Sequence, residues 1–195
     1  SSRAVEPFDV ASIPPIYPRE SAPSPHRSYS RYAFTPSGVS PRALPGFGAG
    51  LVVADSDEHT EDGHITEDLA VRSRMVEKRL RKLMPLKHRA DLFLHEGPSK
   101  ATLGLLAWGS ISGLALEALH LAREAGLDVK VLVPRLLYPV AEEVYRDFFA
   151  SVKRGLVVEQ SHQGQLYRIV RMFVDVPAGV ESFARSGSNP ISPVE

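Results

Sequence analysis

The sequence contains no cysteine among its 195 residues. The chain can therefore form no disulfide, supply no thiolate nucleophile and hold no iron–sulfur cluster through thiolates of its own. Neither charge is in excess, since 23 basic residues balance 23 acidic ones, and this argues against a nucleic-acid-binding protein. No apolar run approaches the ~18 residues of a membrane span, and no signal segment opens the chain. We expect a cytoplasmic protein that binds neither membrane nor nucleic acid.

Composition divides the chain into four segments. Residues 1–50 hold nine of the sixteen prolines. They are expected to form a proline-rich extended arm that lies against a partner or another domain. Residues 51–88 combine an acidic loop with a basic helix, residues 89–180 alternate strands with helices, and residues 181–195 form a loose tail rich in Ser, Gly, Pro and Asn. The chain begins with Ser1 and lacks an initiating methionine, so we expect a piece of a longer polypeptide.

The stretch 103–126 organises the alternating segment. Residues 103–108 form an apolar run without alternation, which predicts a strand covered on both faces, as in the middle of a parallel sheet. Gly109-Ser110 then predicts a turn, and apolar residues at steps of three and four predict a helix over 111–125. Further strands are expected at 51–54, 90–94, 129–133 and 155–158, and further helices at 140–151 and 165–173. The predicted fold class is α/β, an open, mostly parallel sheet with helices on both faces.

Residues 55–68 are the densest polar stretch, with seven carboxylates and two histidines in fourteen positions. A calcium loop counted from Asp55 would need glycine where Thr60 stands, and His59 and His64 do not form an H-E-x-x-H pair. We therefore predict a loop with local salt bridges and no metal site. Thr66 is expected to cap the basic helix that follows.

That helix is predicted to run to about Leu83. Its apolar side chains are expected on one face, at Leu69, Val76, Leu80 and Leu83. Because the preceding loop is acidic and few aromatic residues interleave with the basic ones, a solvated or subunit-facing helix is the better interpretation than a nucleic-acid reader.

Polar residues follow the predicted strands at Gly109-Ser110, Arg135 and Glu159-Gln160, where open α/β sheets bind ligands. Backbone amides at the start of the 111–125 helix would suit an anion there. This arrangement is generic to the fold. The sequence shows no Ser-His-Asp elbow, no paired carboxylates and no dinucleotide fingerprint. The residues alone leave open an enzyme subunit, a non-catalytic α/β protein-interaction module and a small nucleotide-binding flavodoxin-like domain.

Several phrases together resemble the alpha subunit of 2-oxoacid:ferredoxin oxidoreductases, in particular the 2-oxoglutarate type. They occur in the family's order from about Tyr29 to Val174. The phrases are Arg31-Tyr32, Gly38-Val-Ser-Pro-Arg-Ala-Leu-Pro-Gly46, Glu58-His59, Asp62-Gly-His-Ile-Thr-Glu-Asp68, Arg74-Met-Val-Glu-Lys-Arg-Leu-Arg-Lys82, Trp108-Gly-Ser110, Leu137-Tyr-Pro139 and Gly164-Gln-Leu166. The segment Ser2-Arg-Ala-Val-Glu-Pro-Phe-Asp9 also resembles the family.

The resemblance implies the C-terminal portion of an alpha subunit, with the alternating segment folded like the C-terminal domain of transketolase. The complete enzyme would oxidatively decarboxylate a 2-oxoacid to an acyl-CoA with coenzyme A and pass two electrons to ferredoxin. Thiamine diphosphate, magnesium and an iron–sulfur cluster would serve the complete enzyme. This fragment alone is expected to bind none of them, to be inactive, and to serve mainly assembly.

The implied partners are the thiamine-diphosphate-binding beta subunit, the rest of the alpha subunit and, as co-substrates of the complex, ferredoxin and coenzyme A. No catalytic residue of the family matches a residue here closely enough to be carried over. The polar residues inside the matching phrases are the candidates to test: Arg42, Glu58, His59, His64 and Gln165.

Overall fold

The computed structural model describes residue 7 and residues 9–13, 29–46 and 50–195. Much of the predicted proline-rich arm, including residues 14–28, lies outside the described residues. The chain divides into an N-terminal unit, Ser1–Lys82, and a C-terminal unit, Leu83–Glu195. No helix in the described parts of the chain is long and apolar enough to cross a bilayer.

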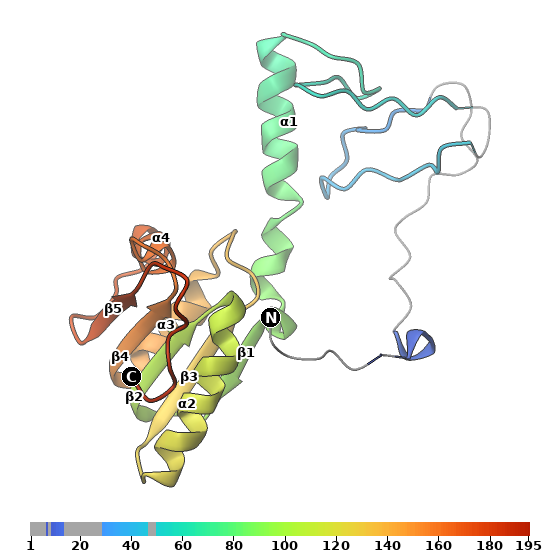
Figure 1. The fold of residues 1–195 in the computed structure, drawn as a ribbon. Coiled ribbons are helices and arrows are strands. Elements are labelled where there is room, and N and C mark those ends of the chain that lie inside the picture. Colours follow the sequence, from blue (N-terminus) through green and yellow to red (C-terminus); the bar gives the residue numbers. More distant parts are fainter. Residues whose placement is uncertain (1–6, 8, 14–28, 47–49) are drawn as a thin grey trace. The chain divides into compact units, whose positions relative to one another are not determined.

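A five-stranded sheet forms the centre of the C-terminal unit (Figure 1). Its strands lie in the order β1-β3-β2-β4-β5. Their bounds are β1 Phe93–Glu96, β2 Ala101–Ala107, β3 Val129–Pro134, β4 Val152–Glu159 and β5 Val180–Ala184. The edge strand β1 pairs antiparallel with β3, and every other pairing is parallel. The carboxyl ends of four strands therefore meet at one edge of the sheet.

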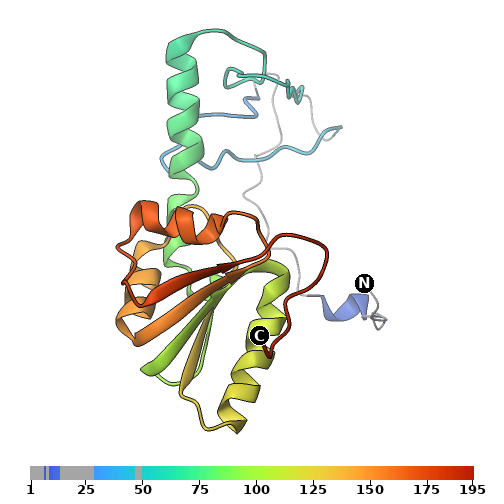
Figure 2. The same ribbon diagram turned by 60° about the vertical axis from the view of Figure 1, so that its left-hand side comes forward.

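Helices cover both faces of this sheet, as Figure 2 shows. The helices are α2 Ser112–Glu124, α3 Glu142–Ala150 and α4 Gln165–Phe173. Successive side chains of β3 pack on opposite faces of the sheet. Val131 and Val133 belong to the apolar cluster under α2, while Leu132 belongs to the cluster under α3 and α4. The apolar strands without alternation are explained by this double coverage.

The predicted open, mostly parallel α/β sheet is confirmed, and the helix predicted at 165–173 has the bounds of α4. The strand predicted at 90–94 begins only at Phe93, because Ala90–Leu92 forms a 3₁₀ turn. Strand β5 was not anticipated. Its five residues follow a Pro-Ala-Gly turn and pair with β4 through the backbone, a long-range contact that the local sequence does not reveal.

The N-terminal unit is built on helix α1, Leu69–Arg81. Asp68 rather than Thr66 caps it, accepting hydrogen bonds from the backbone N–H of Ala70 at 2.8 Å and of Val71 at 2.9 Å. The predicted apolar face is wrong, since Leu69, Val76 and Leu80 are exposed; the buried helix residues are Met75 and Lys78.

The segment 29–46 lies against a different face of α1. Arg74 lies over the Phe34 ring with 4.0 Å to its centroid, and the Arg81 guanidinium donates to the Thr35 carbonyl. The strand predicted at 51–54 is absent: these residues carry no strand pairing. They run beside Gly63 instead, where a Cβ would lie 2.2 Å from the Val53 carbonyl oxygen.

Candidate functional site

The acidic stretch that precedes α1 folds into a tight loop. His59 pairs with Ile65 in an isolated antiparallel bridge. Backbone bonds close the loop, from the Thr60 N–H to the His64 carbonyl at 2.9 Å and from the Thr66 N–H to the Glu58 carbonyl at 2.9 Å. Most carboxylates of this loop are exposed. Ion pairs join Asp62 to His64 and Glu58 to Arg79, as expected for the predicted loop with local salt bridges.

Glu58 and Arg79 form the central ion pair of this loop and α1. Two guanidinium nitrogens of Arg79 donate to the two carboxylate oxygens of Glu58, at 3.0 and 2.7 Å. The Glu58 side chain is 10% exposed and that of Arg79 is 43% exposed. The hydrogen bonds from Arg79 hold the pKa of Glu58 below its usual value, against a smaller opposing effect of burial. They also raise the pKa of Arg79.

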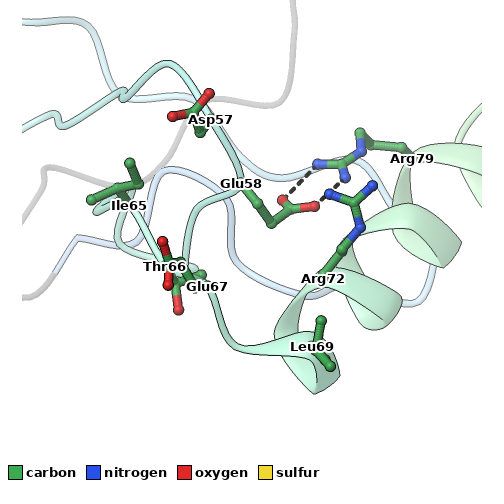
Figure 3. A pocket seen from close by; sticks show the side chains of 8 residues that line it. All are labelled: Asp57, Glu58, Ile65, Thr66, Glu67, Leu69, Arg72 and Arg79. Atoms are coloured by element: carbon green, nitrogen blue, oxygen red, sulfur yellow. Dashed lines mark hydrogen bonds and ion pairs between the residues drawn. The ribbon is translucent and has the colours of Figure 1, made fainter.

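The pair borders a cavity of about 760 Å³. Figure 3 shows Glu58 between Arg79 and Arg72, with the Arg72 guanidinium directed toward the same carboxylate. The lining residues are Asp57, Glu58, Ile65, Thr66, Glu67, Leu69, Arg72 and Arg79. Because Arg79 keeps Glu58 ionised and occupies both of its oxygens, this carboxylate is poorly suited to act as a general acid or base.

The structure brings four of the five sequence candidates into the N-terminal unit. His59 stacks on the Tyr32 ring with centroids 3.8 Å apart. His64 is exposed and its Nδ1 lies 3.3 Å from an Asp62 carboxylate oxygen. Arg42 borders a second cavity, separate from the one around Glu58. His59 follows Glu58 in the chain, so three of the four lie in one short loop.

Gln165 lies in the other unit, at the first residue of α4. Its side chain is exposed, and its backbone N–H donates to the Ser161 hydroxyl at 3.3 Å. Glu159, at the end of β4, is fully buried and accepts hydrogen bonds from the same helix start. The sequence placed Glu159 at a strand end, but gave no sign that the α4 backbone amides would bind it.

The sequence analysis also missed, as site residues, the basic side chains of α1 and of Lys82, which caps its C-terminus. Arg72, Lys78, Arg79 and Lys82 all border one of the two cavities. Their signal was present in the basic helix, because residues three or four apart lie on one helix face. In the described part of the chain, no three His, Asp or Glu residues are grouped so that they could hold a metal ion.

We expect Arg79→Met to destabilise the N-terminal unit by about 1–2 kcal/mol, because it leaves the largely covered Glu58 carboxylate without its two donors. Hydrogen exchange followed by mass spectrometry would report faster exchange in residues 58–66. Arg81→Met is the matched control, since Arg81 lies on the same helix and, among the described residues, its side chain bonds only the Thr35 carbonyl. Equal exchange in the two variants would contradict a stabilising role for the Glu58–Arg79 pair.

The same pair predicts a loss of stability in acid. The folded-state pKa of Glu58 lies below its ordinary value of 4.5, so the pair stabilises the fold above that value and stops doing so as the pH falls through the folded pKa. Urea unfolding of this loop, followed by NMR, should occur at lower urea near pH 3 than near pH 7. Glu58→Gln should already be less stable near pH 7 and show a smaller further loss in acid.

No family model matches the chain. It is 32% identical over 179 residues to the alpha subunit of 2-oxoacid:ferredoxin oxidoreductase 2 of Aeropyrum pernix, which is 90% of this chain and 27% of that subunit. It is 30% identical over 152 residues to the alpha subunit of 2-oxoacid:ferredoxin oxidoreductase 1 of Sulfurisphaera tokodaii, which is 75% of this chain and 23% of that subunit. The chain thus spans about a quarter of the length of these curated relatives.

A solved structure agrees with the sequence relatives. It is the 2-oxoglutarate:ferredoxin oxidoreductase of Magnetococcus marinus with 2-oxoglutarate, coenzyme A and succinyl-CoA bound. The match has a TM-score of 0.76 and 29% identity, and covers 90% of this chain and 30% of that chain. This structural match covers nearly all of this chain. The comparison of structures and the comparison of sequences therefore agree on the same kind of relative.

Proposed function

Because the chain is homologous over 90% of its length to an alpha subunit of the 2-oxoacid:ferredoxin oxidoreductases, we propose that it works as part of such an enzyme. The complex would decarboxylate a 2-oxoacid oxidatively, join the acyl group to coenzyme A and pass the two electrons to ferredoxin. The solved relative binds 2-oxoglutarate, coenzyme A and succinyl-CoA. We therefore take 2-oxoglutarate as the substrate and succinyl-CoA as the product. The 90% match to that relative, at a TM-score of 0.76, carries the proposal.

Within the complex, this chain would serve assembly rather than chemistry. Three of its five polar candidate residues are engaged in contacts within the chain: Glu58 with Arg79, His59 with Tyr32, and His64 with Asp62. In the C-terminal unit, the buried Glu159 carboxylate is bonded to the start of α4. Groups held this way stabilise the folded subunit and are not themselves free to act as an acid or a base.

The iron–sulfur cluster of such an enzyme does not fit the donors of this chain. The sequence has no cysteine to ligate an iron–sulfur cluster. The magnesium that would accompany thiamine diphosphate is usually held by one or two carboxylates together with the phosphates. We propose that a beta subunit and the remaining alpha-subunit sequence provide these sites, and we assign no catalytic step to residues of this chain.

The test uses the native polypeptide that contains this chain, purified from its source cells with an antibody together with whatever co-purifies. We expect an iron-containing partner and ferredoxin reduction that needs both coenzyme A and a 2-oxoacid, fastest with 2-oxoglutarate. A preference for pyruvate would contradict the proposed substrate and keep the proposed reaction. An intact complex that reduces no ferredoxin with any 2-oxoacid would contradict the proposed reaction itself.

A second measurement separates this proposal from a free nucleotide-binding domain. Thiamine diphosphate and flavin mononucleotide are titrated into the isolated 195-residue chain and followed by calorimetry. We expect no tight binding of either compound by the chain alone. Tight flavin binding would overturn the assembly role, because it would show that the α/β sheet holds a redox cofactor by itself.

A further inference from the structure

Helix α1 carries an exposed apolar face, which we call the α1 stripe and which consists of Leu69, Val76 and Leu80. These side chains are 77%, 40% and 45% exposed. Their spacing places them on one face of the helix, away from the face whose residues are buried. Ile65, 54% exposed, borders the same cavity as Leu69 and extends the apolar surface beyond the helix. A helix at the surface of a single chain needs only one apolar face, so the second one suits a partner.

The α1 stripe follows the seven-residue repeat of helices that pack side by side. Leu69 and Val76 occupy one of the two core positions of this repeat, and Ser73 and Leu80 occupy the other. Ser73 is polar, but its hydroxyl donates to the Leu69 carbonyl at 3.0 Å. The hydroxyl therefore keeps a hydrogen bond when a partner covers it, and its burial leaves no donor unpaired. The whole face can be covered by a second helix.

One charge lies on each side of the α1 stripe, Arg72 on one flank and Glu77 on the other. Figure 3 shows the Arg72 guanidinium directed toward Glu58, but both oxygens of that carboxylate already accept hydrogen bonds from Arg79. No hydrogen bond or ion pair joins the side chain of Arg72 or of Glu77 to another of the described residues. Each flank therefore presents a charge that a partner can pair.

We propose that the α1 stripe packs in parallel against the α1 stripe of a second copy of this chain. In a parallel two-fold pair, residue 72 of each helix lies beside residue 77 of the other, so Arg72 meets Glu77 twice. An antiparallel pair would place Arg72 beside Arg79 of the other copy, which brings like charges together. The charges on the two flanks thus favour both the partner and its direction.

The other cations of α1 do not oppose this pairing. Arg74 and Arg81 contact the 29–46 segment, on a different side of the helix. Lys78 is buried on that covered side, and Arg79 is paired with a carboxylate of its own chain. Because only residues of the N-terminal unit take part, the pairing holds or fails independently of the proposed oxidoreductase reaction.

Sedimentation of the full chain over a range of concentrations tests the pairing. We expect a monomer–dimer equilibrium at about 1–100 µM protein. Arg72→Glu and Glu77→Lys should each weaken the dimer by about tenfold, because each change turns two attractions across the pair into repulsions. The double variant Arg72→Glu/Glu77→Lys should restore the dimer, since it exchanges the two charges. Both side chains are exposed, so the variants should fold.

Three results of this experiment would overturn the proposal. The first is a chain that stays monomeric throughout the concentration range. The second is a double variant that dimerises no more tightly than the single variants, which would show that Arg72 and Glu77 do not meet. The third is a tighter dimer of Arg72→Glu, which is the result expected of an antiparallel pair, where residue 72 would lie beside Arg79.

An introduced cysteine tests the direction separately, because the chain has no cysteine of its own. Ser73→Cys places a thiol where it faces the same thiol of the second copy in a parallel pair. Mild oxidation should therefore link this variant into a covalent dimer faster than Arg81→Cys. Arg81 is the matched control, since it is exposed on the same helix but lies ~100° around the axis from Leu80. Equal rates of cross-linking in the two variants would contradict the parallel pair.

Discussion

Glu159→Ala is expected to lower the free energy of unfolding of the C-terminal unit by about 3 kcal/mol or more. The Glu159 side chain is fully buried. Its carboxylate accepts the backbone N–H groups of Leu166 at 3.0 Å and Tyr167 at 3.1 Å, and the Ser161 hydroxyl at 3.1 Å. Alanine would leave these donors unsatisfied inside the protein and would remove an anion from the positive end of α4.

Urea unfolding followed by the fluorescence of Trp108 measures this effect, because Trp108 is the only tryptophan and packs against the core of this unit. Glu159→Gln should lose less stability, since the amide keeps the size and one acceptor of the side chain. Glu181→Ala is the matched control: this glutamate is exposed on the neighbouring strand β5, and its removal should change stability by no more than about 0.5 kcal/mol. A Glu159→Ala protein as stable as that control would refute the structural role.

The Glu159 carboxylate also bears on whether the sheet binds a phosphate at the start of α4. Open α/β sheets bind ligands beyond the carboxyl ends of their strands, commonly with a phosphate on the amides of a helix start. Glu159 ends β4, and its carboxylate is bonded to the first amides of α4. The chain thus fills with its own side chain the place that a phosphate would take at this helix. That arrangement favours a packing role for the sheet over nucleotide binding there.

The sequence predicted the elements whose signal is local. The apolar run of β2, the turn at Gly109 and the spacing of α4 depend on neighbouring residues, and the structure confirms all three. It did not predict β5, which pairs with β4 over a long sequence separation. The face of α1 predicted to be buried is also wrong, because helical spacing shows that an apolar face exists but not which face is covered. In the structure Met75 is buried and Leu69 is exposed.

The candidate site residues show the same contrast between local signals and contacts that only folding creates. Glu58 and His59 became candidates because they are polar residues inside the phrases that resemble a known family, and those phrases are short stretches of consecutive residues. Their partners Arg79 and Tyr32 lie 21 and 27 positions away, and only folding brings them together. The second cavity is the strongest case, because three basic residues that line it, Arg31, Lys78 and Lys82, come from two segments of the chain whose charges are balanced elsewhere by acidic residues. Net charge therefore gave no sign of it.

Gly63→Ala is expected to destabilise the N-terminal unit by about 3 kcal/mol or more. Gly63 has φ +97°, a conformation that L-residues rarely adopt, and a Cβ there would lie 2.2 Å from the Val53 carbonyl oxygen and 2.7 Å from its carbon. Both atoms belong to the backbone, so no side-chain rotation relieves the overlap. The loop must move away from residues 51–54, and we expect hydrogen exchange to become faster from 51 to 66.

Gly46→Ala separates the two causes, because Gly46 has a similar φ of +82° but no atom of the described residues within 4 Å of a Cβ placed there. That variant should lose only about 1 kcal/mol, the cost of the unfavourable backbone conformation. The difference between the variants then measures how closely the loop packs on residues 51–54. The same loop carries Glu58 and His59, so Gly63→Ala should also disturb the Glu58–Arg79 pair and the support of Tyr32, and with them both cavities. Equal losses in the two variants would show that backbone conformation alone accounts for the glycine, and that the close approach to Val53 does not hold the loop.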